Sequence, residues 1–488
     1  MTVIGNNMKR SESSRRITVL LLGFVGLAMQ TAVYAWLWFS VYYPILHDWR
    51  RKTLQLDQET GEYVLVGDWY MGRGLTYTIW GHIFTLLLYF VLLIVISNAY
   101  GGLKIGYLKP LDVFLSQIFI LFLVNFFTYA QFLIIRIQYV DVLPMLGMFL
   151  IQLLISFAWA YITNAIYMRI FPPRRLLLVN GEYAADDIIR KFDTRKDKYN
   201  IVKKINISEG IDKVYEECLG DYDGVIIWDV PSQYRNGLVK YCYGRNIRIY
   251  VMPKITDVLL KGSSQLHIFD TPVLLLREYS IKIEQRFIKR FLDILISLLL
   301  IIITSPLMLI AAIVTKLYDG GPILYKQVRC TKDRREFKIM KFRSMSVDAE
   351  KDGVARLASK NDSRITPFGK FIRACRIDEL PQLFNILIGD MSFIGPRPER
   401  PEIIDQYMEE MPEFAFRTKV KAGLTGYAQV YGKYNTTPYD KLKLDLTYIE
   451  NYSLWLDLKI ALLTPKILIT PDATEGIEDD QITAKKNS

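Results

Sequence analysis

Four long stretches without a charged residue constrain the fold of this chain more than any other feature. They cover residues 17–46, 74–103, 113–135 and 142–168. A helix crosses the hydrocarbon core of a membrane with about 20 apolar residues, so each stretch is long enough. Aromatic residues such as Trp36, Trp38 and Trp80 gather near their ends, as is typical of membrane interfaces. We therefore predict four transmembrane helices. The alternative, buried helices of a large soluble protein, is disfavoured by so many apolar runs close together.

The composition agrees with a membrane protein that meets anionic groups. Hydrophobic residues make up 51% of the 488 residues, and the formal net charge is +11. An anionic membrane surface and phosphate-bearing substrates explain this charge more simply than nucleic acid, which we do not expect as a partner. The four cysteines form no CxxC pair and the three histidines are scattered, so a zinc site is disfavoured.

Basic residues beside the apolar stretches predict how the helices are oriented. Such residues precede the first stretch, separate the second from the third, and follow the fourth, for example Arg15, Lys104 and Arg169. The positive-inside rule places these segments in the cytoplasm. Basic residues at 50–52 and 73, in the predicted first outer loop, run against the rule.

From residue 172 the pattern changes to that of a soluble α/β domain. Buried strands are expected at 176–179, 224–228 and 247–251, with a helical stretch at 184–192 and another between the last two strands. Strands that alternate with helices predict a parallel sheet. Only Gly181 follows the first strand, where a dinucleotide-binding fold would carry GxGxxG. We therefore expect a Rossmann-like domain that binds no NAD.

A fifth charge-free run, 294–315, has Ser305 and Pro306 near its middle. Proline removes a helix hydrogen bond and clashes with the preceding turn, so a break is expected there. The run is then either a re-entrant helix hairpin that enters one leaflet and returns, or a kinked spanning helix. The residues alone leave these two alternatives about equal.

The chemistry-bearing residues begin with two adjacent carboxylates, Asp378 and Glu379, which stand just before Pro381. Apolar residues at helical spacing follow them, so the pair is expected at the amino end of an amphipathic helix. An acid there is ordinarily a cap that the helix dipole favours. A carboxylate pair can also hold Mg2+, and a carboxylate can attack phosphorus to form an acyl phosphate.

Basic residues flank this pair on both sides in the sequence. Lys341 and Arg343 lie upstream, Arg373 and Arg376 immediately before, and Arg397 lies between two prolines downstream. Arginine binds phosphate oxygens through a planar fork, and proline on both sides would fix its direction. The same residues are as easily a solvated or lipid-facing surface. Composition therefore supports a phosphate site and no more.

At these motifs the region from about residue 281 to 470 resembles the bacterial sugar transferase family, the monotopic phosphoglycosyl transferases. The matching segments are Tyr325-Lys-Gln327-Val-Arg329, Lys341-Phe-Arg-Ser-Met345, Arg364-Ile-Thr366, Asp378-Glu-Leu-Pro-Gln382, Gly395-Pro-Arg-Pro398 and Ser453-Leu-Trp-Leu-Asp457. The helices and α/β domain before them are similar to the large subgroup that starts capsule, O-antigen or exopolysaccharide synthesis. The sequence departs from the family pattern at Thr331 and Arg334, where glycines are common.

This resemblance implies the transfer of hexose 1-phosphate from a UDP-sugar to undecaprenyl phosphate, with release of UMP. It implies that Asp378 is the nucleophile and that Glu379 supports it and helps to hold Mg2+, so that both are metal ligands. It also implies phosphate-handling roles for Lys341, Arg343, Arg373 and Arg397, and a functional role for Asp457. The break at Ser305 and Pro306 matches the family's re-entrant hairpin and favours that alternative.

The expected organisation has four parts. Residues 1–171 form a four-helix transmembrane domain, and residues 172–280 form the Rossmann-like domain. Residues 281–470 form an α+β catalytic domain with a re-entrant helix at 286–316, and 471–488 form a disordered tail. The resemblance implies the bacterial cytoplasmic membrane, with the catalytic domain on the cytoplasmic face. A homodimer is an arrangement that the large membrane and middle domains would allow.

Other function classes stay open beside the transferase. A non-catalytic membrane scaffold for polysaccharide assembly would keep the helices but would not need the carboxylate pair. A nucleotide-sugar oxidoreductase is disfavoured by the missing glycine fingerprint. A glycosyltransferase that moves sugar without phosphate is the nearest enzymatic rival. Glucose and galactose are favoured by analogy, and N-acetylated or deoxygenated sugars are not excluded.

Overall fold

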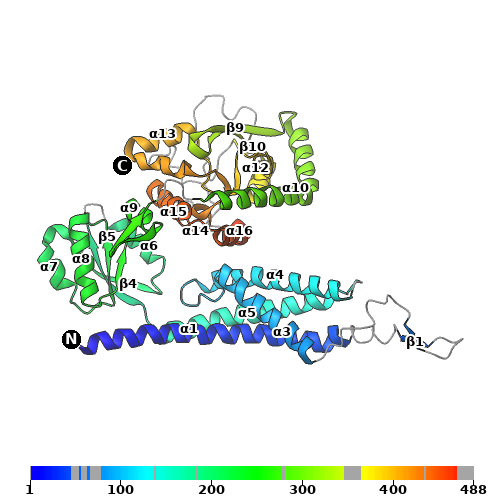
Figure 1. The fold of residues 1–488 in the computed structure, drawn as a ribbon, viewed down its shortest axis with the longest axis horizontal. Helices are drawn as coiled ribbons and strands as arrows, with labels where there is room; N and C mark the ends of the chain where they lie inside the picture. Colours follow the sequence, from blue (N-terminus) through cyan, green and yellow to red (C-terminus); the bar gives the residue numbers. More distant parts are fainter. Residues whose placement is uncertain are drawn as a thin grey trace. The chain divides into compact units, whose positions relative to one another are not determined.

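The computed structural model divides the chain into two compact units, Met1–Met252 and Pro253–Ser488. It describes residues 2–44, 54–56, 63–65, 79–136, 139–181, 185–276, 281–345, 364–432 and 436–469. The predicted tail 471–488 and the basic residues predicted in the first outer loop therefore lie outside the described residues. Figure 1 shows both units, which are described separately below.

The first unit begins with long apolar helices. They are α1 (Thr2–Leu37), which continues as a π-helical turn (η1, Trp38–Tyr42), α3 (Ile79–Tyr100), α4 (Pro110–Arg136) and α5 (Leu143–Ile170), with a small hairpin of β1 (Leu54–Leu56) and β2 (Tyr63–Leu65). Four segments here are long and apolar enough to cross a membrane: 12–42, 80–100, 110–134 and 143–170. Each overlaps one of the four predicted stretches.

Buried polar side chains join these helices. Gln152 of α5 donates to the hydroxyl of Tyr89 on α3 at 2.8 Å and accepts from Asn125 of α4 at 2.8 Å. Gln30 of α1 donates to Ser156 of α5 at 2.9 Å. Polar side chains within an apolar bundle satisfy one another and so fix which helix faces meet.

An α/β domain completes the first unit. Its strands are β3 (Arg174–Asn180), β4 (Tyr199–Asn206), β5 (Gly224–Trp228) and β6 (Ile249–Val251), and its helices are α6 (Asp186–Asp193), η2 (Ile207–Glu209), α7 (Ile211–Glu217) and α8 (Ser232–Gly244). The four strands form one parallel sheet in the order β4-β3-β5-β6, so the predicted parallel α/β unit is confirmed. Strand β4 was not predicted, because it is an edge strand whose exposed lysines Lys203 and Lys204 hide its apolar alternation.

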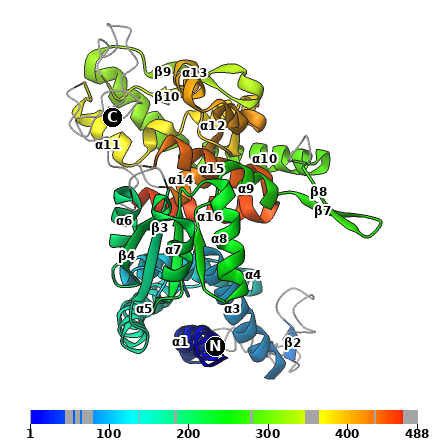
Figure 2. The same cartoon turned by 90° about the vertical axis from the view of Figure 1, so that its left-hand side faces the viewer.

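The second unit begins at Pro253, well before residue 281, where the sequence analysis begins the catalytic domain. Helix α9 (Ile255–Lys261) and the hairpin of β7 (Ser264–Ile268) and β8 (Thr271–Leu275) belong to it. Gly262 explains the attachment of α9: a Cβ atom there would lie 2.3 Å from the Cβ atom of Glu450, so only glycine permits this approach. Figure 2 shows the β7–β8 hairpin extending from the rest of this unit.

The remaining elements of the second unit form a mixed α+β domain. The strands are β9 (Leu324–Cys330), β10 (Glu336–Phe342), β11 (Ser392–Ile394) and β12 (Gly423–Thr425). The helices are α10 (Ile283–Asp319), η3 (Lys332–Arg334), α11 (Pro367–Ala374), η4 (Ile377–Glu379), α12 (Gln382–Ile388), α13 (Pro401–Glu410), η5 (Pro412–Lys419), α14 (Tyr427–Tyr431), α15 (Pro438–Glu450) and α16 (Leu454–Ile469). Strands β9 and β10 form an antiparallel hairpin, and β11 pairs with β12 in parallel.

Helix α10 is the fifth segment that is long and apolar enough to cross a membrane. Pro306 lies inside it, and Figure 1 shows the ribbon of α10 changing direction sharply along its length. Leu300, before the proline, packs against the cluster around Leu383, while Met308 and Ala311, after it, pack against Phe342. Both parts of α10 therefore contact the same small domain.

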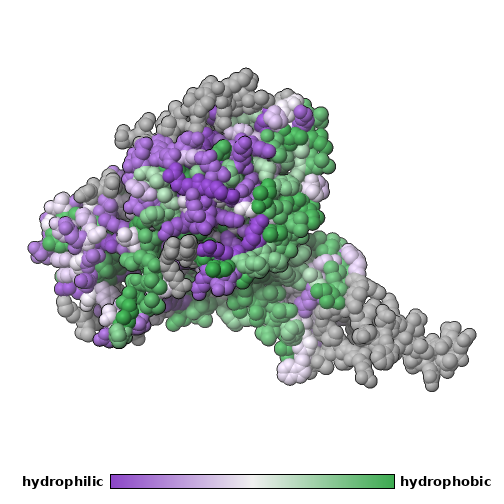
Figure 3. Space-filling view, turned by 45° about the horizontal axis from the view of Figure 1, so that its top comes forward, coloured by the Kyte–Doolittle hydropathy of each residue, from purple (hydrophilic) through white to green (hydrophobic). Residues whose placement is uncertain are grey.

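The outer surface of α10 is strongly apolar. Phe287, Ile303 and Leu309 are each more than 60% exposed. Figure 3 shows such side chains gathered in continuous green areas that are separate from the purple hydrophilic areas. Exposed apolar surface of this extent marks a membrane or protein contact.

Candidate active site

The two adjacent carboxylates lie on a short 3-10 turn, η4, between α11 and α12. Thr366 caps α11 by accepting a hydrogen bond from the Gly369 amide at 2.9 Å. Arg376 then adopts a left-handed conformation with φ of 55°, which reverses the chain before Asp378. Pro381 is the N-cap of α12. The pair is thus held directly before the amphipathic helix, where the sequence predicted it.

Glu379 gathers three positive side chains around one carboxylate oxygen. Its Oε1 lies 3.2 Å from Nζ of Lys341, 3.3 Å from the guanidinium of Arg376 and 3.0 Å from that of Arg397. These positive charges hold the pKa of Glu379 well below its usual range, although burial acts in the opposite direction. Glu379 is therefore ionised and orders the cations of the site.

Asp378 behaves differently from its neighbour. It is 8% exposed, and among the residues that the structure describes no hydrogen-bond partner of its carboxylate is found. Burial, reinforced by the negative charge of Glu379, raises the pKa of Asp378 to about 6, while Lys341, Arg373 and Arg376 oppose the rise. A buried carboxylate near several cations is suited to attack an electrophile that carries negative charge.

Lys341 reaches this site from the β9–β10 hairpin. It pairs with Tyr325 across the two strands, so both lie on the same face as Gln327 and Arg329. Burial lowers the pKa of Lys341, and the charge of Glu379 partly restores it. The hairpin face therefore presents a positive, hydrogen-bonding surface toward the carboxylate pair.

Arg397 follows β11, which pairs in parallel with β12. The backbones approach closely here, because a Cβ atom on Gly423 would lie 2.0 Å from the Gly395 nitrogen. The attraction of Glu379 raises the pKa of Arg397, which stays a permanent cation. The loop that begins at Gly395 therefore delivers a fixed positive charge to Glu379.

The other predicted phosphate-binding residues lie on separate elements and have different partners. Arg373, on α11, acts electrostatically on Asp378. Arg343 is 9% exposed and its Nε donates to the carbonyl of Pro322 at 2.8 Å, a contact that fixes the connection from α10 to β9. Asp457, on α16, has other partners: Lys289 at 2.7 Å and the Tyr448 hydroxyl at 2.8 Å. The structure thus brings Lys341, Arg373 and Arg397 to the carboxylate pair and gives Arg343 and Asp457 contacts of their own.

Ser305 compensates for the helix hydrogen bond that is lost at Pro306, where a break was predicted. Pro306 has no amide hydrogen, so the carbonyl of Ile302 loses its helical partner. The hydroxyl of Ser305 donates to that same carbonyl at 2.8 Å. A serine before the proline therefore satisfies the group that the proline leaves without a donor, which apolar surroundings require.

A divalent cation would have few ligands from the protein itself. Among the residues that the structure describes, no group of three or more metal-binding side chains occurs. Mg2+ needs only one or two carboxylates when substrate phosphates complete its shell. Asp378 and the second oxygen of Glu379 offer hard oxygen donors of this kind, so the residues present fit such a shared site.

Two of these contacts were not predicted from the sequence, that of Arg376 with Glu379 and that of Lys289 with Asp457. In the sequence, Arg376 was identified only as a basic residue near the carboxylate pair. The left-handed conformation of its backbone, which directs the side chain to Glu379, is visible only in the structure. Its separation of three residues from Glu379 was the available signal. Lys289, the partner of Asp457, stands far away in the sequence, and no local pattern connects the two.

Comparison with known proteins gives a consistent result. Residues 284–471 match the family model described as bacterial sugar transferase. The chain is 46% identical over 187 residues to UDP-N-acetylgalactosamine-undecaprenyl-phosphate N-acetylgalactosaminephosphotransferase of Aeromonas hydrophila, which covers 38% of this chain and 44% of that protein. It is 44% identical over 181 residues to UDP-glucose:undecaprenyl-phosphate glucose-1-phosphate transferase of Klebsiella pneumoniae, covering 36% of this chain and 39% of that protein.

A third relative is covered more completely. The UDP-glucose:undecaprenyl-phosphate glucose-1-phosphate transferase of Caulobacter vibrioides is 42% identical over 189 residues, which are 38% of this chain and 70% of that protein. The chain spans less than half the length of the Aeromonas and Klebsiella relatives. The similarity to the family model lies in the C-terminal part of the chain, which contains the carboxylate pair and its cations.

Proposed function

This chain belongs to the bacterial sugar transferase family, and from that premise we propose that it transfers a hexose 1-phosphate from a UDP-sugar to undecaprenyl phosphate. The observation that carries the proposal is the buried carboxylate of Asp378 beside Glu379, with four cationic side chains acting on the pair. A nucleotide diphosphate sugar brings negative charge and a phosphorus electrophile, which this arrangement suits. The names of the relatives support undecaprenyl phosphate as the acceptor.

The reaction proposed has two steps. A carboxylate oxygen of Asp378 attacks the phosphorus that bears the sugar, and the bond from this phosphorus to the bridging oxygen breaks, so that UMP leaves with the electron pair. An oxygen of undecaprenyl phosphate then attacks the same phosphorus, and the bond to Asp378 breaks. The carboxylate is regenerated, and undecaprenyl-diphosphate-sugar is the product.

Each neighbour of Asp378 has a role in these steps. Lys341 and Arg397, ordered by Glu379, bind the phosphate oxygens on which charge accumulates; Arg373 and Arg376 stabilise the ionised nucleophile. Mg2+ bound by Asp378 and Glu379 would supply further neutralisation of the diphosphate charge. Burial keeps water from competing with the lipid phosphate for the aspartyl phosphosugar.

The proposed membrane arrangement follows from the long apolar helices of both units. The four N-terminal helices span the membrane, and α10 enters one leaflet and returns at Pro306. This would place Asp378 near the headgroups on the cytoplasmic face of the bacterial inner membrane. A soluble nucleotide sugar and a lipid phosphate could both reach it there.

The direct test is the nucleotide by-product. The full-length protein in detergent would be incubated with Mg2+, undecaprenyl phosphate and a panel of UDP-sugars that includes glucose, galactose and N-acetylated sugars. We expect UMP release that depends on the lipid and disappears in Asp378→Asn. The matched control is Asp405→Asn, since Asp405 is 60% exposed in a surface ion pair.

Other outcomes lead to other functions. Release of UDP would indicate an ordinary glycosyl transfer, and release of neither nucleotide would favour a membrane scaffold. A phosphosugar mass increment on the peptide that contains Asp378, formed without lipid acceptor, would test the covalent step separately.

A further inference from the structure

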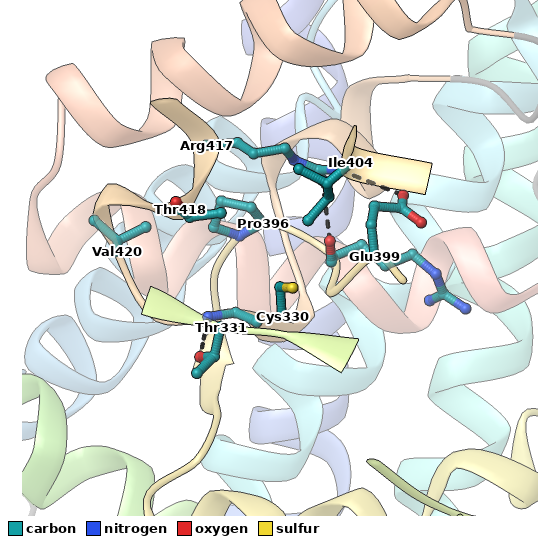
Figure 4. Close-up of a pocket in the computed structure, with 10 residues that line it drawn as sticks. Cys330, Thr331, Pro396, Glu399, Ile404, Arg417, Thr418 and Val420 are labelled. Carbon is teal, nitrogen blue, oxygen red and sulfur yellow. Dashed lines mark hydrogen bonds and ion pairs between the residues drawn. The ribbon is translucent and has the colours of Figure 1, made fainter. Parts of the chain in front are cut away.

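Behind the loop that carries Arg397 lies a group of buried charged side chains with no role in the steps above. The side chain of Arg417, on η5, is 2% exposed. Its guanidinium lies 2.9 Å from Asp445 of α15 and 3.4 Å from Glu399, which Lys441 also contacts. Figure 4 shows Arg417 reaching over this loop toward Glu399.

The same residues hold the main chain of the loop. The carbonyl of Arg397 accepts from Arg417 at 3.0 Å, and the carbonyl of Pro398 accepts from Arg329 at 3.2 Å. The carbonyl of Glu399 accepts from the amide of Cys330 at 2.9 Å. Three consecutive carbonyls on one loop are therefore each occupied by a donor from another element.

The first half of the loop is held by the strands. The amide of Gly395 donates to Thr425 at 2.9 Å, and the carbonyl of Pro396 accepts from the amide of Gly423 at 2.8 Å. Every residue from Gly395 to Glu399 thus has a main-chain hydrogen bond to a partner outside the loop. With the main chain held in this way, the side chain of Arg397 can move only by rotation about its own torsion angles. Its guanidinium lies 3.0 Å from Glu379.

Burying Arg417 between two acids is an expensive way to stabilise a fold. Desolvation offsets much of the attraction in a buried ion pair, and apolar side chains of similar volume often stabilise a protein equally well. The planar guanidinium of Arg417 donates to the carbonyl of Arg397 while it lies within ion-pair distance of two carboxylates, a combination that its rigid fork permits. What this arrangement supplies beyond stability is a defined geometry for the Arg397 loop.

We propose that Arg417 is a positioning residue: held by Asp445 and Glu399, it fixes the main chain at Arg397 so that this guanidinium is preorganised for the phosphate group in transfer. The inference rests on the proposed function for its catalytic part. Its structural part, the fixing of the loop, stands without it.

The structural part is tested by amide hydrogen exchange on the full-length protein in detergent, with Arg417→Lys. Lysine keeps the charge but lacks the fork, so it cannot hold both acids and the carbonyl. We expect exchange in peptides covering 392–400 and 420–426 to rise roughly tenfold or more, since local opening becomes easier. The matched control is Arg335→Lys, because Arg335 is 60% exposed and pairs with Asp390 on the surface. Unchanged exchange in Arg417→Lys would overturn the proposal.

The catalytic part is tested by a double-mutant cycle on UMP release, with the UDP-sugar that the panel identifies. A displaced catalytic group can cost about 100-fold in rate, so a large loss of kcat/KM is expected in Arg417→Lys. In an Arg397→Ala background the same substitution should change kcat/KM by no more than about twofold, because Arg417 acts through Arg397. Losses that multiply would mean that Arg417 acts independently of Arg397, and the positioning role would be wrong.

A second variant keeps the test decisive if Arg417→Lys does not fold. Asp445→Asn retains the shape of the side chain, which is 2% exposed, and weakens the hold on Arg417. It should raise exchange in the same peptides and show the same dependence on Arg397. If the wild-type protein turns over no UDP-sugar, the proposed function fails while hydrogen exchange still decides whether Arg417 fixes the loop.

Discussion

At the scale of single residues, the two adjacent carboxylates contribute to stability with opposite signs. Asp378 has a pKa of about 6 in the folded protein, above the value near 3.9 of an unfolded chain. Its ionised form is therefore disfavoured by folding, and the stability of the protein falls as pH rises through that interval. Glu379 has a depressed pKa, so its ionised form is favoured by folding.

The first prediction concerns Asp378→Asn. The variant should lose turnover, yet at pH 7.5 it should unfold with a free energy about 1–3 kcal/mol larger than the wild-type protein, since no buried charge must be formed. At pH 4.5 the gain should largely vanish, because Asp378 is then protonated in the wild-type fold. Thermal unfolding at both pH values checks this, and a variant less stable than the wild type at pH 7.5 would contradict it.

The second prediction concerns Glu379→Gln. Removing this charge leaves Lys341, Arg376 and Arg397 facing one another without their shared anion. We expect a loss of roughly 1–3 kcal/mol at pH 7.5, moderated by the partial exposure of the cations. Because folding lowers the pKa of Glu379, the ionised carboxylate stabilises the folded protein above about pH 4.5. This contribution diminishes in stronger acid. Equal stability of variant and wild type would show that the cations do not depend on Glu379.

The third prediction adds the activity profile. If ionised Asp378 is the nucleophile, kcat/KM should fall as pH decreases below about 6. Lys341→Met removes a charge that opposes the rise in the pKa of Asp378, so its remaining activity should decline at a higher pH than in the wild type. A profile that stays flat from pH 7.5 to 5 would exclude Asp378 as the group that titrates.

At the scale of elements, we propose that α10 sets how the catalytic domain meets the membrane. The Ser305 hydroxyl satisfies the carbonyl that Pro306 leaves without a donor, so the break is stable in apolar surroundings. Asp293 anchors the first part of the helix by accepting from the Ser392 hydroxyl at 3.1 Å and the Phe393 amide at 2.9 Å. These contacts hold the first part of α10 against β11.

The fourth prediction tests this topology by cysteine labelling in membrane vesicles. In a Cys375→Ser background, which removes the one exposed cysteine among the described residues, Glu284→Cys and Lys326→Cys should be labelled from the same side. Both positions are exposed: Glu284 lies in the first turn of α10, and Lys326 lies on β9, beyond the other end of the helix. In addition, replacing Ser305 and Pro306 by leucine should favour a straight spanning helix and move Lys326→Cys to the opposite side. Opposite sidedness without those leucines would establish α10 as a fifth spanning helix.

At the scale of the whole molecule, the second unit contains every residue assigned to the reaction. The family match lies within it, and the Caulobacter relative is mostly covered by a matched segment of 189 residues. The four N-terminal helices and the α/β domain are bound to each other instead: Glu12 of α1 pairs with Arg174 of β3 at 3.2 Å and also with Arg248. Ion pairs therefore connect α1 with the α/β domain within the first unit.

The fifth prediction is that residues 253–488 fold and react alone. The fragment should be membrane-bound through α10 and should release UMP within about tenfold of the full chain, because no catalytic group is lost. The corresponding fragment from residue 281 omits α9, which packs on α15, and should be less stable. An inactive but folded 253–488 fragment would mean that the first unit contributes to the reaction.

The sequence by itself determined what depends on periodicity and on local rules. The apolar runs predicted the long apolar helices and the buried strands predicted a parallel α/β domain, while Pro306, where a break was predicted, lies inside the single helix α10. The motifs indicated the family, which the comparisons confirmed. Strand β4 was missed because its lysines conceal it, and residues 253–280 were assigned to the middle domain because the contact of Gly262 with Glu450 is distant in sequence.

Only the tertiary structure decided which charges meet. Lys341 and Arg397 come from a strand and a loop, and nothing local in the sequence brings them to the Glu379 oxygen that Arg376, three residues away, also contacts. It also gave Asp457 a partner in Lys289 and placed Arg417 behind the Arg397 loop. Electrostatic partners are chosen by distance in space, so sequence order could name the charged residues but could not pair them.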